Sequence, residues 1–159
     1  MAIEFNKKGY LKRNHKLTFD EFKTQFVDDF PFYNRRIIFD EFESYVKKLF
    51  SELKEPYLKI WIDGSFVTDE LEPNDIDFVV FIFHIFHEIE NKLAIFDEGF
   101  HYIDNYFIPY FSDNSITTEL ITYWEKYFSK DRYGSNKGFI ELNVLVLDEV
   151  IVDFNPNLL

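Results

Sequence analysis

The 159-residue chain contains no cysteine and only 5 glycine and 5 proline residues. The absence of cysteine excludes disulfide bonds, thiolate nucleophiles and metal sites that depend on Cys ligands. Any bound metal ion would therefore be held by oxygen or imidazole ligands. The glycine and proline residues occur singly and form no linker, so we expect one domain that spans residues 1–159.

Basic residues are also scarce in this sequence. Its 17 Lys and Arg residues face 29 Asp and Glu residues, which gives a formal net charge of −12 at neutral pH. A protein field of this sign repels a polyanion, and this argues against a nucleic acid as partner. A local basic cleft remains compatible with the composition.

Long hydrophobic runs are missing as well. The longest apolar stretch covers residues 78–86 and is interrupted by His84, whereas about 20 residues are needed to span a bilayer. Residues 1–16 contain no apolar run of the kind found in a signal peptide. The sequence therefore predicts a cytoplasmic protein with no membrane partner.

Aromatic residues are abundant, with 21 Phe and 10 Tyr in a chain that is 47% hydrophobic. This content is sufficient for a folded core and excludes a disordered chain. We expect that core to be built largely from flat, bulky side chains.

Hydrophobic periodicity predicts both helices and strands. A capping box at residues 18–21 begins a helix that runs to about residue 27, and the next helix ends before Pro56. Further helices are expected at 85–96 and 116–128, and strands at 57–62, 76–83, 100–108 and 139–147. This order predicts an α/β (α+β) fold, with one mixed sheet packed with helices and a helical N-terminal extension at about 1–35.

The segment between Ile60 and Val80 carries the most informative pattern. A predicted strand leads into a Gly64-Ser65 turn, and after nine intervening residues a second strand begins with Asp75-Ile76-Asp77. Residues i and i+2 of a strand share one face, so the two carboxylates lie about 6–7 Å apart along the chain. Such a pair is stable when one member is protonated or when a cation lies between them. Without cysteine, the hard ion Mg²⁺ is favoured.

The turn beside these carboxylates suits an anion. Gly64 permits close approach of the backbone, and Ser65 adds a hydroxyl to the backbone N–H groups. An anion site beside paired carboxylates is typical of metal-assisted phosphoryl or nucleotidyl transfer.

The Gly-Ser turn, the nine-residue gap and the Asp-Ile-Asp sequence resemble the signature of the DNA-polymerase-β-type nucleotidyltransferase superfamily. The whole chain more loosely resembles small bacterial proteins of unassigned function within that superfamily. The residues that carry this wider resemblance are Gly9-Tyr10-Leu11, Gly64-Ser65-Phe66, Pro73-Asn74-Asp75-Ile76-Asp77, Tyr123-Trp124 and Lys137-Gly138. The resemblance implies a nucleotidyltransferase-like domain.

Members of this superfamily place a third carboxylate on a later strand. Asp104 is the best match, and Glu141 is the alternative. The resemblance implies that Asp75 and Asp77 coordinate two Mg²⁺ (or Mn²⁺) ions, one of them shared with Asp104. Ser65 and the Gly64 turn would hold the β- and γ-phosphates of a nucleoside triphosphate. Asp104 would help to deprotonate a hydroxyl that attacks the α-phosphate and expels pyrophosphate.

The segment between Ile60 and Asn91 contains eight acidic residues and no Lys or Arg. A bound triphosphate would add about four negative charges, so basic residues from elsewhere must reach the site. The candidates are Arg35 and Arg36 before the second helix, or Lys130, Arg132 and Lys137 near the last strand. Arg132 and Lys137 flank a turn and are the favoured phosphate-binding pair.

Two functional hypotheses remain open. The first is an enzyme that moves a nucleoside monophosphate from a triphosphate to a hydroxyl of a protein or small-molecule acceptor. The second is a catalytically inactive binding module of the same fold, an antitoxin- or defence-like partner protein. Convergence of Asp75, Asp77 and Asp104 with a facing cation would favour the enzyme.

The predicted helix at 116–128 carries several aromatic residues at helical spacing. We expect Leu120, Tyr123, Trp124 and Phe128 to face the core, not to form a platform for stacking bases.

Overall fold

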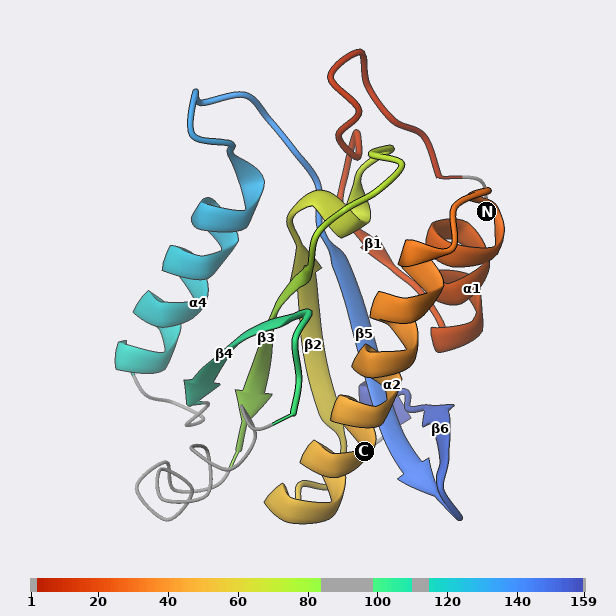
Figure 1. Ribbon diagram of the computed structural model, residues 1–159. Coiled ribbons are helices and arrows are strands. Elements are labelled where there is room, and N and C mark those ends of the chain that lie inside the picture. Colours follow the sequence, from red (N-terminus) through yellow and green to blue (C-terminus); the bar gives the residue numbers. More distant parts are fainter. Residues whose placement is uncertain (1–2, 84–98, 110–114, 159) are drawn as a thin grey trace.

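One mixed β-sheet of six strands lies at the centre of the computed structural model, which describes residues 3–83, 99–109 and 115–158 (Figure 1). The strand order is β1-β5-β2-β3-β4, and β6 pairs with β5. The bounds are β1 His15–Lys16, β2 Leu58–Asp63, β3 Ile76–Ile82, β4 Ile103–Pro109, β5 Ile140–Leu147 and β6 Val150–Asp153. The chain is therefore a single domain of mixed helix and strand content, as the sequence predicts.

The directions of the strands bring several strand ends to one edge of the sheet. β2 is antiparallel to both β3 and β5, whereas β4 is parallel to β3. The end of β2 therefore lies beside the beginnings of β3 and β4. In Figure 1 this is the upper edge, and the segments 64–74 and 131–137 lie above it.

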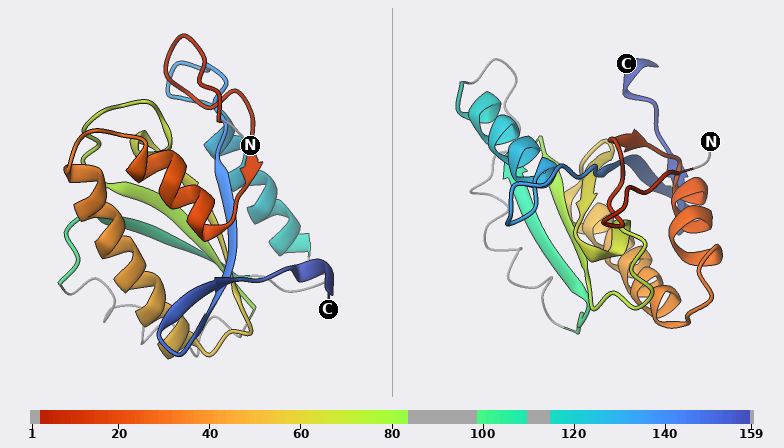
Figure 2. Two further views of the ribbon diagram at one scale, coloured as in Figure 1. Left: turned by 90° about the vertical axis from the view of Figure 1, so that its right-hand side faces the viewer. Right: turned by 90° about the horizontal axis from the view of Figure 1, so that it is seen from above.

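Helices cover both faces of the sheet (Figure 2). On one face lie α1 (Phe19–Lys23), its π-helical continuation (Thr24–Asp28) and α2 (Asn34–Leu53), and on the other lies α4 (Ser115–Ser129). The capping box predicted from the sequence is present, because Thr18 Oγ1 accepts the Glu21 N–H and Glu21 Oε2 accepts the Thr18 N–H. Short 3₁₀ helices follow β2 at Ser65–Val67 and β6 at Pro156–Leu158.

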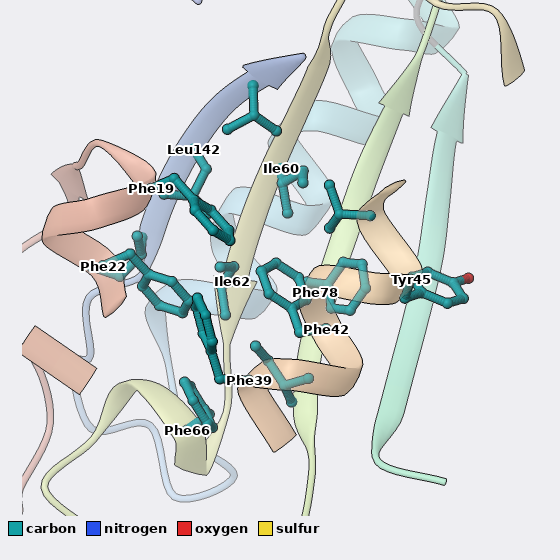
Figure 3. Close-up of a cluster of buried hydrophobic side chains, with 14 of the residues drawn as sticks. Phe19, Phe22, Phe39, Phe42, Tyr45, Ile60, Ile62, Phe66, Phe78 and Leu142 are labelled. Carbon is teal, nitrogen blue, oxygen red and sulfur yellow. The ribbon is translucent and has the colours of Figure 1, made fainter. Parts of the chain in front are cut away.

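The larger core lies between the sheet and the layer of α1 and α2 (Figure 3). Phe22 is fully buried and its ring contacts the rings of Phe26, Phe39, Phe42 and Phe66. Leu11 also belongs to this core. The N-terminal third of the chain is thus an integral layer of the domain.

A smaller core fills the opposite face, beneath α4. It contains Trp61, Val79, Phe81, Ile108, Phe128 and Phe139, with Leu120, Ile121 and Trp124 packed against it. The alternation of strand residues between the two cores explains this division. In β2, for example, Ile60 and Ile62 belong to the first core, whereas Trp61 belongs to the second.

Most predicted elements are found, with ends that differ by a few residues. The predicted helix at 85–96 lies outside the described residues. β1 and β6 were not predicted, because strands of two and four residues give too few alternations to be recognised. Among the residues described, no helix has the length and apolar character required to cross a membrane.

Candidate active site

Three aspartates lie side by side across neighbouring strands at the upper edge of the sheet. Asp63 ends β2, Asp77 is the second residue of β3, and Asp104 is the second residue of β4. In the strand register, Asp77 pairs with Asp63 on one side and with Asp104 on the other. Neighbouring strands are about 4.8 Å apart, so the three side chains form one row.

The alternation of the strands determines the face on which this row lies. Ile76 and Phe78 point into the larger core, so Asp77 between them faces the side of the sheet that carries α4. Ile108 of β4 lies in the core beneath α4, and Asp104, four residues earlier, shares its face. The row therefore opens toward the layer that contains α4.

Asp75 precedes β3 and is half-buried. Burial, and next the charge of Asp104, raise the pKa of its carboxyl group. The charge of Asp75 in turn raises the pKa of Asp77. The three carboxylates predicted from the sequence are thus close enough to influence one another, although Asp75 does not line the cleft described below.

Asp77 has the most strongly raised pKa of these aspartates. Burial raises its pKa most, followed by a hydrogen bond with the Asp104 carboxyl group and by the charges of Asp75, Asp104 and Asp63. Together these effects raise the pKa of Asp77 to about 8. Loss of the proton from Asp77 is therefore unfavourable in the metal-free protein, and a cation at this position would favour it.

Gly64 allows the Asp77 carboxylate to approach the turn after β2. Its φ angle is +76°, and a Cβ atom at this position would lie 2.0 Å from Asp77 Oδ2. Only glycine combines this backbone conformation with such a close approach. Ser65 follows at the start of the short 3₁₀ helix. The predicted Gly64-Ser65 turn is thus directly beside the predicted carboxylate.

These residues face a cleft with a volume of about 780 Å³. Its lining comes from the N-terminal turn, the Gly64 turn, β3, β4, α4 and the 130–138 segment. The charged residues that line it are Lys8, Asp63, Asp69, Glu70, Asp77, Asp104, Lys126, Lys130, Asp131, Arg132 and Lys137. Positive side chains therefore do enter the acidic site, although the central segment of the sequence carries none.

The basic candidates from the sequence separate into two groups. Lys130, Arg132 and Lys137 line the cleft. Lys137 also forms a salt bridge with Asp63, with 2.5 Å between Nζ and Oδ2. Burial raises the pKa of Asp63, and the lysine opposes this effect. Sequence reasoning did not identify Lys8 and Lys126, because nothing local in the sequence connects them with the Gly64 turn.

Arg35 and Arg36 do not reach the cleft, so the alternative that placed them near phosphate is wrong. Arg35 is fully buried and donates hydrogen bonds to the backbone carbonyls of Phe26, Phe66, Thr68 and Glu70. Three of these carbonyls belong to the segment that follows Gly64-Ser65. Arg35 therefore supports the turn from behind. Arg36 pairs with Asp28.

Glu141, the alternative third carboxylate, belongs to a different environment. It lies on β5 opposite Trp61, two strands away from Asp77 with β2 in between, and level with Val79 of β3. It accepts hydrogen bonds from the Trp61 indole (2.8 Å) and from Asn143 (3.1 Å). Among the two alternatives, only Asp104 lies beside Asp77.

An aromatic wall lines the cleft next to Asp104, formed by Tyr106, Trp124 and Tyr127. The expectation that the aromatic residues of this helix all face the core is wrong for Tyr123, which is 57% exposed. Trp124 contacts the core but also lines the cleft. Helical spacing alone does not separate these two environments, because the stripe is wider than the core beneath it.

The chemistry of the donor set suits a hard divalent cation. The three predicted ligands offer only carboxylate oxygens, and their mutual repulsion would be relieved by positive charge. Across residues 3–83, 99–109 and 115–158, however, no group of three or more His, Cys, Asp or Glu side chains is arranged so that it could hold a metal ion. Mg²⁺ commonly binds one or two carboxylates together with substrate phosphates and water, which does not require a complete protein cage.

The comparisons with known proteins add a family. A protein-family model described as a family of unknown function (DUF6932) matches residues 3–143. All residues that line the cleft, from Lys8 to Gly138, fall inside this range. No curated protein and no solved structure matches the chain. The chain therefore belongs to the DUF6932 family.

Proposed function

We propose that the cleft is the active site of a Mg²⁺-dependent nucleotidyltransferase of the DNA-polymerase-β type. The substrate would be a nucleoside triphosphate, and the acceptor a hydroxyl of a protein or small molecule. The observation that carries this proposal is the pairing of Asp77 with Asp104 in the strand register, facing a cleft that also contains Gly64, Ser65 and positive side chains. Carboxylates, an anion-binding turn and cations are the groups that this reaction requires.

The charge distribution of the cleft supports separate sites for phosphate and metal. Arg132 is exposed at the rim, where its guanidinium could bind phosphate oxygens in two places at once. Ser65 and the Gly64 turn would bind the same β- and γ-phosphates from the other side. Lys137 is already paired with Asp63, so its main contribution would be to neutralise that carboxylate.

Asp75, Asp77 and Asp104 would hold Mg²⁺ (or Mn²⁺), with substrate phosphates completing the site. The bound ion would supply neutralisation of the charge that develops on the phosphate oxygens. Asp104 would accept the proton of the incoming hydroxyl. The hydroxyl oxygen then forms a bond to the α-phosphorus, the bond from that phosphorus to the bridging oxygen breaks, and pyrophosphate leaves with the electron pair. We place this reaction in the cytoplasm, where nucleoside triphosphates are available.

The alternative, an inactive binding module, is less well supported. A third carboxylate directed away from Asp77 would favour it, yet Asp104 lies beside Asp77. A salt bridge that neutralises the predicted ligand pair would also favour it, but the salt bridge of Lys137 involves Asp63. These two observations support the enzyme.

Thermal unfolding with added nucleotides tests the proposal. We would measure Tm with ATP, GTP, CTP or UTP, each with and without Mg²⁺ or Mn²⁺. A ligand present at 100 times its Kd stabilises a protein by about 2.7 kcal/mol, which corresponds to a rise in Tm of roughly 5–11 °C in a domain of this size. We expect this rise only when metal and nucleotide are both present.

Two variants make the test specific. Asp75→Asn/Asp77→Asn should abolish the shift, because it removes two of the proposed ligands. Glu141→Gln removes a carboxylate outside the cleft and should retain it. A shift with this pattern would justify a search for the acceptor with labelled nucleotide. No shift with any triphosphate would contradict the proposed function.

A further inference from the structure

The aromatic wall of the cleft contains exposed side chains, whereas most of the described aromatic side chains are at least partly buried. Tyr106 is 51% exposed and Tyr127 is 59% exposed, and both line the cleft with Trp124. Tyr106 comes from β4, and the other two come from α4. Two consecutive elements of the chain, a strand and a helix, therefore contribute to one surface.

The wall is supported from behind. The ring of Trp124 lies 5.2 Å from that of Tyr106 and 5.6 Å from that of Tyr127. Trp124 also packs edge-on against Phe128, which is buried in the core beneath α4. Rings that are held in this way lose little conformational freedom when a planar ligand stacks on them.

The wall also lies next to the carboxylate row. Tyr106 follows Asp104 by two residues on β4, so both side chains share one face and lie about 6–7 Å apart along the strand. The charge of Asp104 is the main cause that raises the pKa of the Tyr106 hydroxyl, followed by burial and by Tyr127. The positive residues of the 130–137 segment line the same cleft.

We infer that the aromatic wall binds the base of the nucleoside triphosphate by stacking. This inference rests on the proposed function and adds to it the residues that recognise the base. The triphosphate would occupy the charged part of the cleft, with its α-phosphate at Asp77 and Asp104. The base would extend past Asp104 to Tyr106, Trp124 and Tyr127.

Stacking on aromatic rings determines the kind of selectivity that we expect. Every base has a flat face, so all four triphosphates bind, and the larger purines bind more tightly than the pyrimidines. The wall therefore selects nucleotides over phosphate chains without a base.

Binding titrations with and without a base test this inference. In the presence of Mg²⁺, we would measure Kd for ATP, GTP, CTP, UTP and inorganic tripolyphosphate, using the natural chain and Tyr127→Leu. Loss of a stacked ring should raise Kd for ATP by about 5- to 30-fold. The affinity for tripolyphosphate should be unchanged.

Control variants separate stacking from other effects. Tyr127→Phe retains the ring and should bind ATP as the natural chain does. Tyr133→Leu removes a tyrosine that is 83% exposed and does not line the cleft, so it should have no effect. Tyr106→Leu provides a second variant of the wall, and equal Tm values without ligand would establish that each variant is folded.

The results distinguish this inference from the proposed function. If tripolyphosphate binds as tightly as ATP, or if Tyr127→Leu weakens both equally, the wall is not the base site and only this inference fails. The same holds if Tyr127→Leu and Tyr106→Leu bind ATP normally, as expected for a wall that contacts a protein acceptor. If neither ATP nor tripolyphosphate binds, the proposed function fails as well.

Discussion

Lys137 Nζ lies 2.5 Å from Asp63 Oδ2, and both side chains are largely buried and line the cleft. The pair joins the segment that precedes β5 to the end of β2, 74 residues apart in sequence. It also neutralises the carboxylate that is next to Asp77 in the strand register. The positive charge of Lys137 therefore already compensates the charge of Asp63 before any ligand binds.

Lys137→Met should reduce the free energy of unfolding by about 3 kcal/mol at pH 7, because it leaves a buried carboxylate without its partner. Burial raises the pKa of Asp63, so the protonated form becomes available as the pH falls and the loss should be smaller at pH 5 than at pH 8. Urea unfolding at both pH values measures this. Lys137→Met/Asp63→Asn should recover most of the stability, and an equally unstable double variant would contradict the explanation.

Arg35→Leu should destabilise the protein strongly, by about 3–5 kcal/mol. It removes the buried guanidinium that satisfies the carbonyls of Phe26, Phe66, Thr68 and Glu70. Arg36→Leu is the matched control, since Arg36 forms an exposed salt bridge with Asp28, and its loss should cost less than about 1 kcal/mol. Chemical denaturation compares the two, and equal effects would show that the buried position is unimportant.

Gly64→Ala should reduce both stability and metal-dependent nucleotide binding. The new Cβ would clash with Asp77 Oδ2, at a positive φ that alanine adopts poorly. Gly134→Ala is the control, because Gly134 also has a positive φ but, apart from its chain neighbours, no atom of the described residues lies within 4 Å of the added Cβ. We expect a cost of about 1 kcal/mol for Gly134→Ala and at least twice that for Gly64→Ala. Similar losses would mean that Asp77 moves aside without cost.

The stability of the metal-free protein should fall as the pH rises from 5 to 9. The pKa of Asp77 is about 8 in the folded chain and ordinarily 3.8, so the folded state binds the proton more tightly. The stabilisation is present at low pH and is lost as the pH passes through the folded pKa. We expect a fall of about 1–2 kcal/mol, because the group is partly solvated. Urea unfolding in chelator measures it.

Asp77→Asn provides the control for this pH dependence. The asparagine side chain is neutral at every pH, so most of the decrease in stability between pH 5 and pH 9 should disappear. Asp75 would still make a smaller contribution to it. If the slope of the natural chain persists in Asp77→Asn, the carboxylate row is not its source.

The local sequence contained enough information to predict the centre of the candidate site. Gly64, Ser65, Asp75 and Asp77 lie within fourteen residues of each other, at the neighbouring ends of two strands that pair directly. Their arrangement follows from strand alternation and a short connection. The choice of Asp104 over Glu141 required the strand order as well. Both are acidic residues within strands, and only the strand order shows that β4, not β5, lies beside β3.

The aromatic residues of α4 show why the rest of the site could not be predicted. Tyr123, Trp124 and Tyr127 follow one another within a helical stripe, yet only the last two line the cleft. The position of the helix over the sheet decides which part of the stripe is covered. That position depends on contacts with Phe139 and Ile108, which are distant in sequence.

The sequence by itself determined the mixed fold class, the capped first helix, the main strands and the proximity of Asp75 to Asp77. Each of these depends on residues that are close in sequence, where backbone periodicity fixes the geometry. Tertiary structure alone decided that Arg35 is buried beneath the Gly64 turn, that Lys137 is paired with Asp63, and that Tyr106 meets α4. Those contacts join segments separated by 18 or more residues along the chain. The order of strands in the sheet brings them together, and no local pattern encodes that order.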